Sequence, residues 1–250
     1  MQPKITIVTV TYNCASLLEE TMESVFSQTY PNVEYIIIDG GSTDGTVDLI
    51  KAHEAKISCW VSEPDKGIFD AMNKGIGRAT GEWINFMNAG DRLVSADVLD
   101  RVFAEQLPQS LGCIHGLTYN VLADGQKFLD KNTPFYPKPH YSRGMGFNHQ
   151  SVFVRTDLAR SIGFDLSYRV ASDYNMIYSI WKGGKDFRAL PFVVSEVDIT
   201  GFSAHNRRLQ YREVARILGC EHDLRFLLWL NYKSLRSALK RTLSVFRKSA

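Results

Sequence analysis

The stretch Glu82–Asp91 holds the residues of this sequence best suited to binding a metal ion and a phosphate. Its apolar part, Trp83–Met87, has the length of a buried strand and stops at Asn-Ala-Gly-Asp, residues 88–91. In an open parallel sheet, ligands collect beyond the carboxyl ends of the strands. The Asp91 carboxylate, the Asn88 amide and two phosphate groups are oxygen ligands that suit Mg²⁺ or Mn²⁺. The alternative is an ordinary turn in which Asp91 has no ligand.

Two further polar links are expected at the same edge of the sheet. Asp39 follows the apolar run 33–38, where a carboxylate can accept a hydrogen bond from a ribose hydroxyl or a base imide N–H. A helix beginning after Asp65 offers free N–H groups and a positive dipole end to a phosphate or a sugar. The sequence after Asp39 also suggests a phosphatase, but Gly41 occupies the place of the second Asp, so that hypothesis lacks its general acid.

Four alternations of strand and helix are expected to position these side chains. Apolar runs predict strands at 5–10, 33–38, 57–62 and 83–87. A capping box, Ser16 with Glu19, predicts the start of the first helix, and further helices are expected near 47–53 and 68–78. Strands alternating with helices predict an α/β fold with a parallel sheet and right-handed crossovers, of the nucleotide-binding type.

Four motifs stand in order within roughly the first hundred residues: Val8–Asn13, Ile38–Thr46, Ser62–Gly75 and Asn88–Asp91. Together they resemble family 2 glycosyltransferases, and a weaker likeness continues to about Ser203. The resemblance implies a GT-A fold, with a Rossmann-like, mostly parallel sheet flanked by helices. It also implies inverting transfer of a hexose or N-acetylhexosamine from a nucleotide diphosphate donor, expected to be a UDP-sugar, with Mn²⁺ or Mg²⁺ on the diphosphate.

The resemblance also assigns the residues of the donor site. The residues that it places at the donor are Thr9, Thr11, Asn13, Asp39, Ser42, Asp65, Asp70, Asn73, Asn88 and Asp91. The D-x-D metal motif of the family falls on residues 88–91, where Asp91 alone is acidic. Mg²⁺ keeps several waters when bound, so one carboxylate and two phosphates can hold it. Asp91 is therefore the expected protein ligand of the metal.

The second half of the chain supplies candidates for the acceptor side and for the catalytic base. His149 and Gln150, before an alternating strand, resemble a His-Gln element of the family placed near the acceptor. The alternative is that His149 is a hydrogen-bonding scaffold residue. Asp173 opens a predicted helix, where the family has its catalytic base; it would take the proton of the acceptor hydroxyl. The alternative is that Asp173 only complements the helix dipole.

A basic loop follows the last predicted strand, Phe192–Ile199. We expect Arg207 or Arg208 to neutralise the leaving diphosphate as part of a lid, and a plain surface loop is the alternative. An irregular loop is expected at Pro134, Pro137 and Pro139, because prolines spaced in this way do not fit a regular sheet.

Composition and charge predict a globular chain with a distinct tail. The 250 residues are 44% hydrophobic and 22% charged, and the four cysteines match no metal or redox spacing. The whole chain has net charge +2, but residues 224–250 contain seven Lys or Arg and no acid, which leaves −5 on residues 1–223. We predict a GT-A domain at 1–208, with a nucleotide-sugar half (1–95) and an acceptor half (96–208), and a basic amphipathic helical tail at 209–250.

The tail carries an apolar stripe with basic residues beside it. The stripe consists of Leu228, Tyr232, Leu235, Leu239, Leu243 and Phe246. This pattern favours attachment to an anionic membrane surface, and packing on the body or on a second subunit is the alternative. With no signal peptide and no apolar run of spanning length, we expect a cytoplasmic protein, peripheral on the inner membrane face, that acts on a glycan or lipid-linked acceptor and has no nucleic-acid partner.

Two other functions are compatible with the same half-fold. A sugar-binding relative without activity would agree with the incomplete D-x-D motif, although Asp173 is present. A nucleotidyltransferase would need a Gly-rich, basic loop after the first strand, and residues 11–14 contain neither glycine nor a positive charge.

Overall fold

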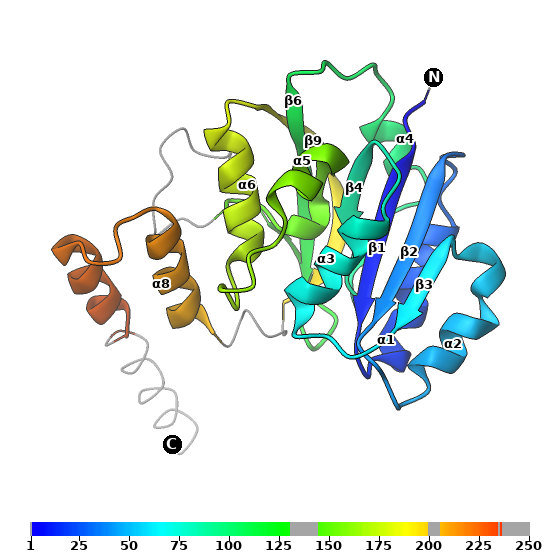
Figure 1. The fold of residues 1–250 in the computed structure, drawn as a ribbon, viewed down its shortest axis with the longest axis horizontal. Coiled ribbons are helices and arrows are strands. Elements are labelled where there is room, and N and C mark those ends of the chain that lie inside the picture. The colour runs from blue at the N-terminus through cyan, green and yellow to red at the C-terminus, as the bar shows by residue number, and fades with distance from the viewer. Residues whose placement is uncertain (1, 131–144, 200–205, 235, 237–250) are drawn as a thin grey trace.

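The computed structural model describes residues 2–130, 145–199, 206–234 and 236. In its first half, four parallel strands lie in the order β3-β2-β1-β4, which confirms the predicted sheet. Helices α1 and α3 lie on opposite faces of these strands (Figure 1). The elements are β1 (Ile5–Thr11), α1 (Ala15–Phe26), β2 (Val33–Asp39), α2 (Thr46–Ala52), η1 (Glu54–Lys56), β3 (Cys59–Ser62), α3 (Ile68–Arg78) and β4 (Trp83–Phe86).

Strand β1 is buried along its whole length. Successive side chains of a strand point to opposite faces, so Ile7 packs in one core cluster with Leu18 of α1, and Val8 packs in the other with Met72 of α3. A β-branched run covered on both faces is typical of a central parallel strand. Because β2 and β4 both pair in parallel with β1, the carboxyl ends of all three strands lie at the same edge of the sheet.

Helix α1 begins differently from the prediction. Its N-cap is Cys14, and the cap residue makes no side-chain hydrogen bond. The N–H groups of Cys14 and Ala15 instead donate to Thr46 Oγ1 and Asp44 Oδ2, both at 3.1 Å. The predicted capping box is therefore wrong, because side chains from the loop after β2 and from the start of α2 satisfy these N–H groups in place of a local cap.

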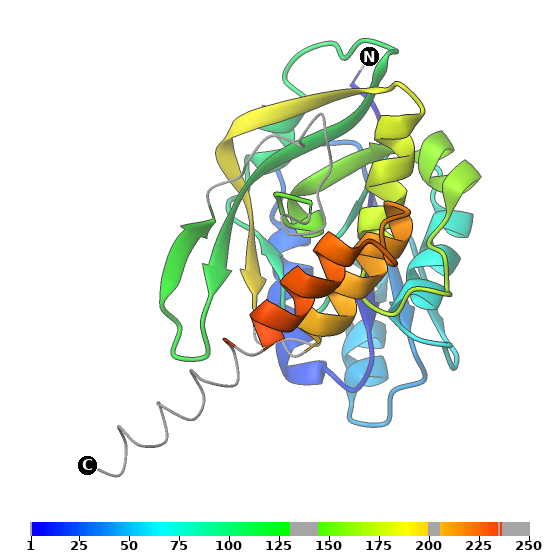
Figure 2. The same cartoon turned by 90° about the vertical axis from the view of Figure 1, so that its left-hand side faces the viewer.

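The second half adds strands of mixed direction. Strand β8 pairs antiparallel with β4, and the sheet continues through β6 and β9 to β5. Strands β6 and β9 pair in parallel and curl across the molecule (Figure 2). The elements are β5 (Arg92–Leu93), α4 (Val98–Val102), β6 (Leu111–Val121), β7 (Lys127–Asp130), η2 (His149–Ser151), β8 (Val152–Arg155), α5 (Thr156–Ile162), α6 (Ser172–Lys182), β9 (Asp186–Asp198) and α8 (Arg207–Ile217).

The irregular segments predicted for this half are only partly described. Strands β6 and β7 pair antiparallel, and the strand predicted to begin at Phe192 begins earlier, at Asp186. The proline loop at 134–139 lies outside the described residues, as do residues 200–205 of the predicted lid.

The end of the described chain packs on the body. The predicted boundary after residue 208 falls inside α8, whose residues Glu213, Val214 and Ala215 are buried. Val214 packs with residues of α6, and the following helical stretch, 224–234, buries Phe226 and Leu230 against Ala215. Figure 2 shows this stretch lying beside α8. Residues 209–234 therefore share a core with the preceding chain.

The other face of residues 224–234 is apolar and exposed. Leu224, Leu228 and Tyr232 expose 68%, 62% and 58% of their surface. The remaining residues of the predicted stripe, Leu235, Leu239, Leu243 and Phe246, lie outside the described residues. Among the helices that the structure describes, none combines the length and the apolarity needed to cross a membrane.

Candidate active site

The carboxyl end of β2 carries a buried acid that shapes the following loop. Asp39 is fully buried and is the register partner of Thr11, which ends β1. The Asp39 carboxylate accepts hydrogen bonds from the N–H groups of Gly41 and Ser42 at 3.2 and 3.0 Å, from the Ser42 hydroxyl, and from the Ser62 hydroxyl at 2.6 Å. Asp39 thereby holds the loop after β2 in a single shape.

Asn13 joins that loop to the turn after β1. Its N–H donates to Ser42 Oγ at 2.7 Å, and its Oδ1 accepts from the N–H of Thr43 at 2.9 Å. Asn13 has a φ of 47°, and among the described residues other than glycine it alone has a positive φ. Such a conformation is uncommon and often occurs where a ligand binds. The structure thus brings Asn13, Asp39 and Ser42 together at one end of the sheet.

Asp65 precedes α3 and Asp70 lies in its first turn, beside this loop. Lys74 pairs with Asp65 Oδ1 at 2.5 Å, and the Asp70 carboxylate accepts from the N–H of Lys66 at 2.9 Å. A Cβ at Gly40 would lie 3.1 Å from Asp65 Oδ2. Glycine at this position therefore allows the loop after β2 to approach Asp65 closely.

Two other predicted donor residues have their polar atoms engaged within the fold. Thr9 is fully buried, and its hydroxyl shares a hydrogen bond of 2.9 Å with the Tyr35 hydroxyl. The Asn73 amide donates to the carbonyl of Phe164 and accepts from its N–H, both at 2.8 Å. Thr11 is also buried, and its hydroxyl has no partner within the described part of the chain.

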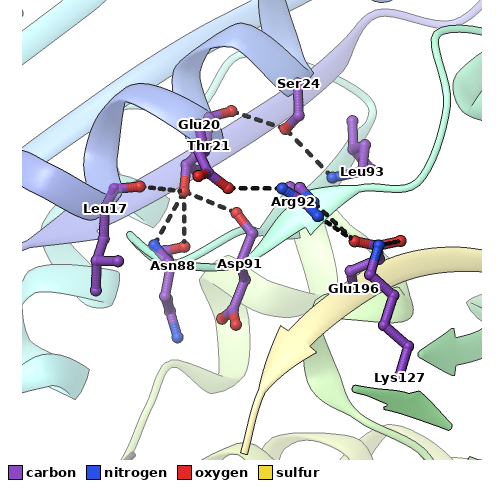
Figure 3. Close-up of polar contacts among 11 residues, drawn as sticks. Leu17, Glu20, Thr21, Ser24, Asn88, Asp91, Arg92, Leu93, Lys127 and Glu196 are labelled. Atoms are coloured by element: carbon purple, nitrogen blue, oxygen red, sulfur yellow. Dashed lines mark hydrogen bonds and ion pairs between the residues drawn. The ribbon is translucent and has the colours of Figure 1, made fainter. Parts of the chain in front are cut away.

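The turn that follows β4 is held by a threonine of α1, which the sequence analysis did not identify. Thr21 is fully buried; its hydroxyl donates to the carbonyl of Asp91 at 2.7 Å and accepts from the N–H of Gly90 at 3.0 Å (Figure 3). Gly90 has a φ of 98°, a left-handed value that glycine adopts without strain. The sequence signal that could have identified Thr21 is its place as a polar residue between the buried Leu18 and Met22.

The Asp91 side chain is buried at the centre of the candidate site. Its carboxylate accepts from Gln150 Nε2 at 2.7 Å and from the N–H of Asp198 at 3.1 Å. Burial raises the pKa of Asp91 to about 7, and the negative charge of Asp198 adds to the effect, against the Gln150 hydrogen bond and the charge of His149. Gln150, predicted on the acceptor side, is therefore a buried partner of Asp91.

A chain of polar contacts links the turn after β4 to α6. Asn88 Nδ2 lies 3.3 Å from His149 Nε2, and His149 Nδ1 lies 3.3 Å from Asp173 Oδ2. In this arrangement the imidazole can donate a hydrogen bond from Nδ1 to the Asp173 carboxylate. The other oxygen of Asp173, Oδ1, accepts from the N–H of Tyr174 at 2.7 Å. Residues from the turn after β4, from η2 and from α6 thus meet at one point.

Buried polar groups of neighbouring strands hold the segment that carries His149 and Gln150 in place. Asn85, in the middle of β4, donates to the carbonyls of Gln150 and Val152 at 2.9 and 2.8 Å. The Ser151 hydroxyl bonds to those of Thr118 and Ser195 at 2.7 and 2.6 Å. An amide within an otherwise apolar strand was the sequence signal for this support.

Strand β9 is held next to Asp91 by an ion-pair network (Figure 3). Glu196 pairs with Arg92 at 2.7 Å and with Lys127 at 2.8 Å, and Arg92 also pairs with Glu20 at 2.6 Å. Burial alone would raise the pKa of Glu196, but the hydrogen bonds from Lys127 and Arg92 hold that pKa below its ordinary value. The network therefore joins α1, β5, β7 and β9 around the site.

The residues around Asp91 fit a hard divalent cation with few protein ligands. Asn88 Oδ1 is buried and has no hydrogen-bond partner within the described residues, and the carboxylates of Asp91 and Asp198 are close enough to repel each other. A cation would relieve that repulsion and provide a partner for the amide oxygen. No group of three or more His, Cys, Asp or Glu side chains suited to a metal occurs in the described chain.

The arginines predicted for the lid lie at the start of α8. Both Arg207 and Arg208 are exposed there. Since residues 200–205 are outside the described chain, the relation of these arginines to the diphosphate stays a prediction.

The fold is shared with solved glycosyltransferase structures. S. aureus TarS in complex with UDP matches with a TM-score of 0.69 and 17% identity over 87% of this chain. The Pyrobaculum calidifontis mannosyltransferase PcManGT, in complex with GDP-Man and Mn²⁺, matches with a TM-score of 0.66 and 19% identity over 94% of this chain. The present chain spans 65% of each of those chains. The α/β architecture is therefore the GT-A type expected from the sequence.

Sequence comparison then gives the family. Residues 6–165 match the model of glycosyl transferase family 2. The PGL/p-HBAD biosynthesis glycosyltransferase of Mycobacterium bovis is 33% identical over 182 residues, which cover 69% of this chain and 68% of the relative. The chain belongs to glycosyl transferase family 2, which confirms the resemblance inferred from its motifs.

Proposed function

We propose that this protein transfers a sugar, with inversion, from a nucleotide diphosphate donor to a hydroxyl of a glycan or lipid-linked acceptor. The observation that carries the proposal is the contact chain Asn88–His149–Asp173. It joins the residues assigned to the donor diphosphate with the residue assigned as base, 85 positions further along the sequence. An inverting displacement needs these two groups close together, one for the leaving group and one for the attacking hydroxyl.

The donor would lie along the carboxyl ends of β1, β2 and β4. The loop that Asn13, Asp39 and Ser42 hold together is the proposed nucleoside site, and the turn at residues 88–91 is the proposed diphosphate site. Mn²⁺ or Mg²⁺, held by Asp91 with help from the Asn88 amide oxygen, would neutralise charge on the leaving diphosphate. TarS with UDP and PcManGT with GDP-Man and Mn²⁺ are neighbours that support a donor of this chemical class.

Asp173 is the proposed general base. The acceptor oxygen forms a bond to the anomeric carbon while the bond from that carbon to the diphosphate oxygen breaks, and the acceptor proton passes to the Asp173 carboxylate. His149 would orient this carboxylate through its Nδ1–H, which leaves lone pairs of Asp173 for the acceptor hydroxyl. Arg207 and Arg208 would add positive charge at the diphosphate.

The acceptor is proposed to be presented at a membrane surface. Leu224, Leu228 and Tyr232 form an exposed apolar face, and residues 235–250 contain five Lys or Arg and no acid. An exposed apolar face that is followed in the sequence by a run of basic residues suits the interface of an anionic membrane. Biosynthesis is also the role stated in the name of the mycobacterial relative, which supports synthesis of a surface polysaccharide or glycolipid.

The test is release of nucleoside diphosphate from a panel of nucleotide sugars, including UDP and GDP donors, with Mn²⁺ present. Transfer to a hydroxyl acceptor should release UDP or GDP, and Asp91→Ala or Asp173→Asn should abolish the release. Asp157→Asn is a matched control, since Asp157 also lies in a first helical turn and accepts from the next N–H, at 2.9 Å. Release of pyrophosphate would indicate a nucleotidyltransferase, and donor binding without release would indicate a binding protein.

A further inference from the structure

Helix α8 contributes a buried carboxylate to the segment that precedes the proposed catalytic base. Glu213 lies in the middle of α8 and exposes only 7% of its surface. Its Oε1 accepts from the N–H of Arg169 at 2.8 Å, and its Oε2 accepts from the N–H groups of Val170 and Ala171 at 2.8 and 2.9 Å. Three consecutive N–H groups therefore converge on one side chain.

The Glu213 carboxylate places a negative charge at the N-terminus of α6, where the helix dipole has its positive end. Ala171 is the N-cap of α6 and makes no side-chain cap of its own. The positive end of the helix dipole and a run of free N–H groups attract an anion, and Glu213 supplies it. Hydrogen bonds from N–H groups to a carboxylate are short and strong, so they restrict the backbone at residues 169–171.

The packing around Glu213 makes the connection rigid. Val214, next to Glu213 in sequence, packs against Ala171 and Tyr174 at the beginning of α6. In the same first turn of α6, the carboxylate of Asp173 contacts His149 Nδ1 at 3.3 Å. Asp173 lies only two residues beyond the last N–H that Glu213 binds. A movement of the backbone at residues 169–171 would therefore move Asp173 relative to His149.

We infer that Glu213 is a positioning residue that places Asp173 for proton transfer from the acceptor. The inference rests on the proposed role of Asp173 as the base. Glu213 acts through the backbone and does not touch the substrate, so its loss should affect the chemical step more than binding of the donor. Displacement of a reacting group by about 1 Å can reduce a rate by 10²-fold. Helix α8, which the sequence places at the start of the tail, thus belongs to the catalytic apparatus.

The experiment compares Glu213→Gln with Glu34→Gln. Glu34 is a matched control because it exposes 7% of its surface and also accepts from a backbone N–H, that of Thr80, at 2.7 Å. The hydrogen bonds that its carboxylate accepts come from Lys4, Thr6 and Thr80, none of which lies in α6. Glu213→Gln should lower kcat by about 10- to 100-fold with the donor KM changed less than about twofold. The kcat of folded Glu34→Gln should stay unchanged. Glu213→Asp, which keeps the charge on a shorter side chain, should give an intermediate kcat and serves if the amide variant does not fold.

Hydrogen exchange provides a readout that needs no substrate. Amide exchange at residues 169–173 should accelerate in Glu213→Gln and stay unchanged in Glu34→Gln. Unchanged exchange, an unchanged kcat, or an equal loss in kcat and donor affinity would overturn the inference. If Asp173→Asn is inactive while Glu213→Gln is fully active, the positioning role fails and the proposed function stands. If Asp173→Asn retains full turnover, the assigned base is wrong and the inference fails with it.

Discussion

The buried carboxyl of Asp91 should make the stability of the folded protein depend on pH. Asp91 exposes 6% of its surface, and burial raises its pKa to about 7 from an ordinary 3.8. The perturbation is Asp91→Asn, which removes the titration while keeping the size of the side chain. The Gln150 amide can turn over to offer its oxygen to the new amide, so the packing is preserved.

The magnitude follows from the displacement of the pKa. The folded-state pKa is about 3 units above the ordinary value, and each unit corresponds to about 1.4 kcal/mol. Because the pKa is raised, the neutral carboxyl contributes its full stability below about pH 4, and this contribution is lost as pH rises through about 7. The wild type should therefore lose on the order of 4 kcal/mol relative to Asp91→Asn between these limits.

The assay is urea denaturation of both proteins at several pH values from 4 to 8, in the presence of a chelator. His149 and Asp198, the titratable neighbours of Asp91, are present in both proteins, so the difference between the two curves isolates Asp91. In a separate sample without chelator, addition of Mn²⁺ at pH 8 should stabilise the wild type and leave the variant unchanged. A difference in unfolding free energy that is constant across the pH range would refute the reasoning, since it would mean that Asp91 is already ionised at pH 5.

Three other predictions concern the surroundings of the site. His149→Asn keeps a donor near the position of Nδ1 and should lower kcat less than His149→Gln; equal losses would exclude an orienting contact with Asp173. Thr21→Val, of similar shape, leaves buried polar groups of the turn 88–91 without a partner, so it should raise the donor KM and lower the free energy of unfolding by about 1–3 kcal/mol. An unchanged donor KM would contradict the proposal that Thr21 supports this turn. At low salt the full chain should sediment with anionic liposomes, while a chain ending at Ser234, which keeps the buried helical residues, should not; if both remain in the supernatant, the tail has another role.

The first half of the fold could be predicted because its signals are local. The strands that end at Thr11 and Asp39 are apolar runs followed directly by turn residues. Parallel topology then requires their carboxyl ends to meet at one edge, together with the turn 88–91. The candidate donor region follows from these patterns, and the family follows from the resemblance of the four motifs in the first hundred residues.

The partners of the polar side chains could not be predicted in the same way. Gln150 pairs with Asp91 across 59 positions of sequence, and Glu213 binds the N–H of Arg169 across 44. These residues are brought together by the curled pairing of β6 and β9 and by the docking of α8 on α6. The type of a residue and its neighbours in sequence do not predict which distant element will pack against that residue.

By itself, the sequence determined the alternation of strands and helices, the edge at which Asp39 and Asp91 lie, and the family of the chain. Tertiary structure alone decided that Thr9 and Asn73 are engaged within the fold, that Asp91 is shielded from water, and that α8 reaches the start of α6. The physical reason is the separation along the chain of the residues that decide each feature. Strand and helix patterns depend on residues a few positions apart, whereas the partner and the solvation of a polar group depend on elements that meet only after the chain has folded.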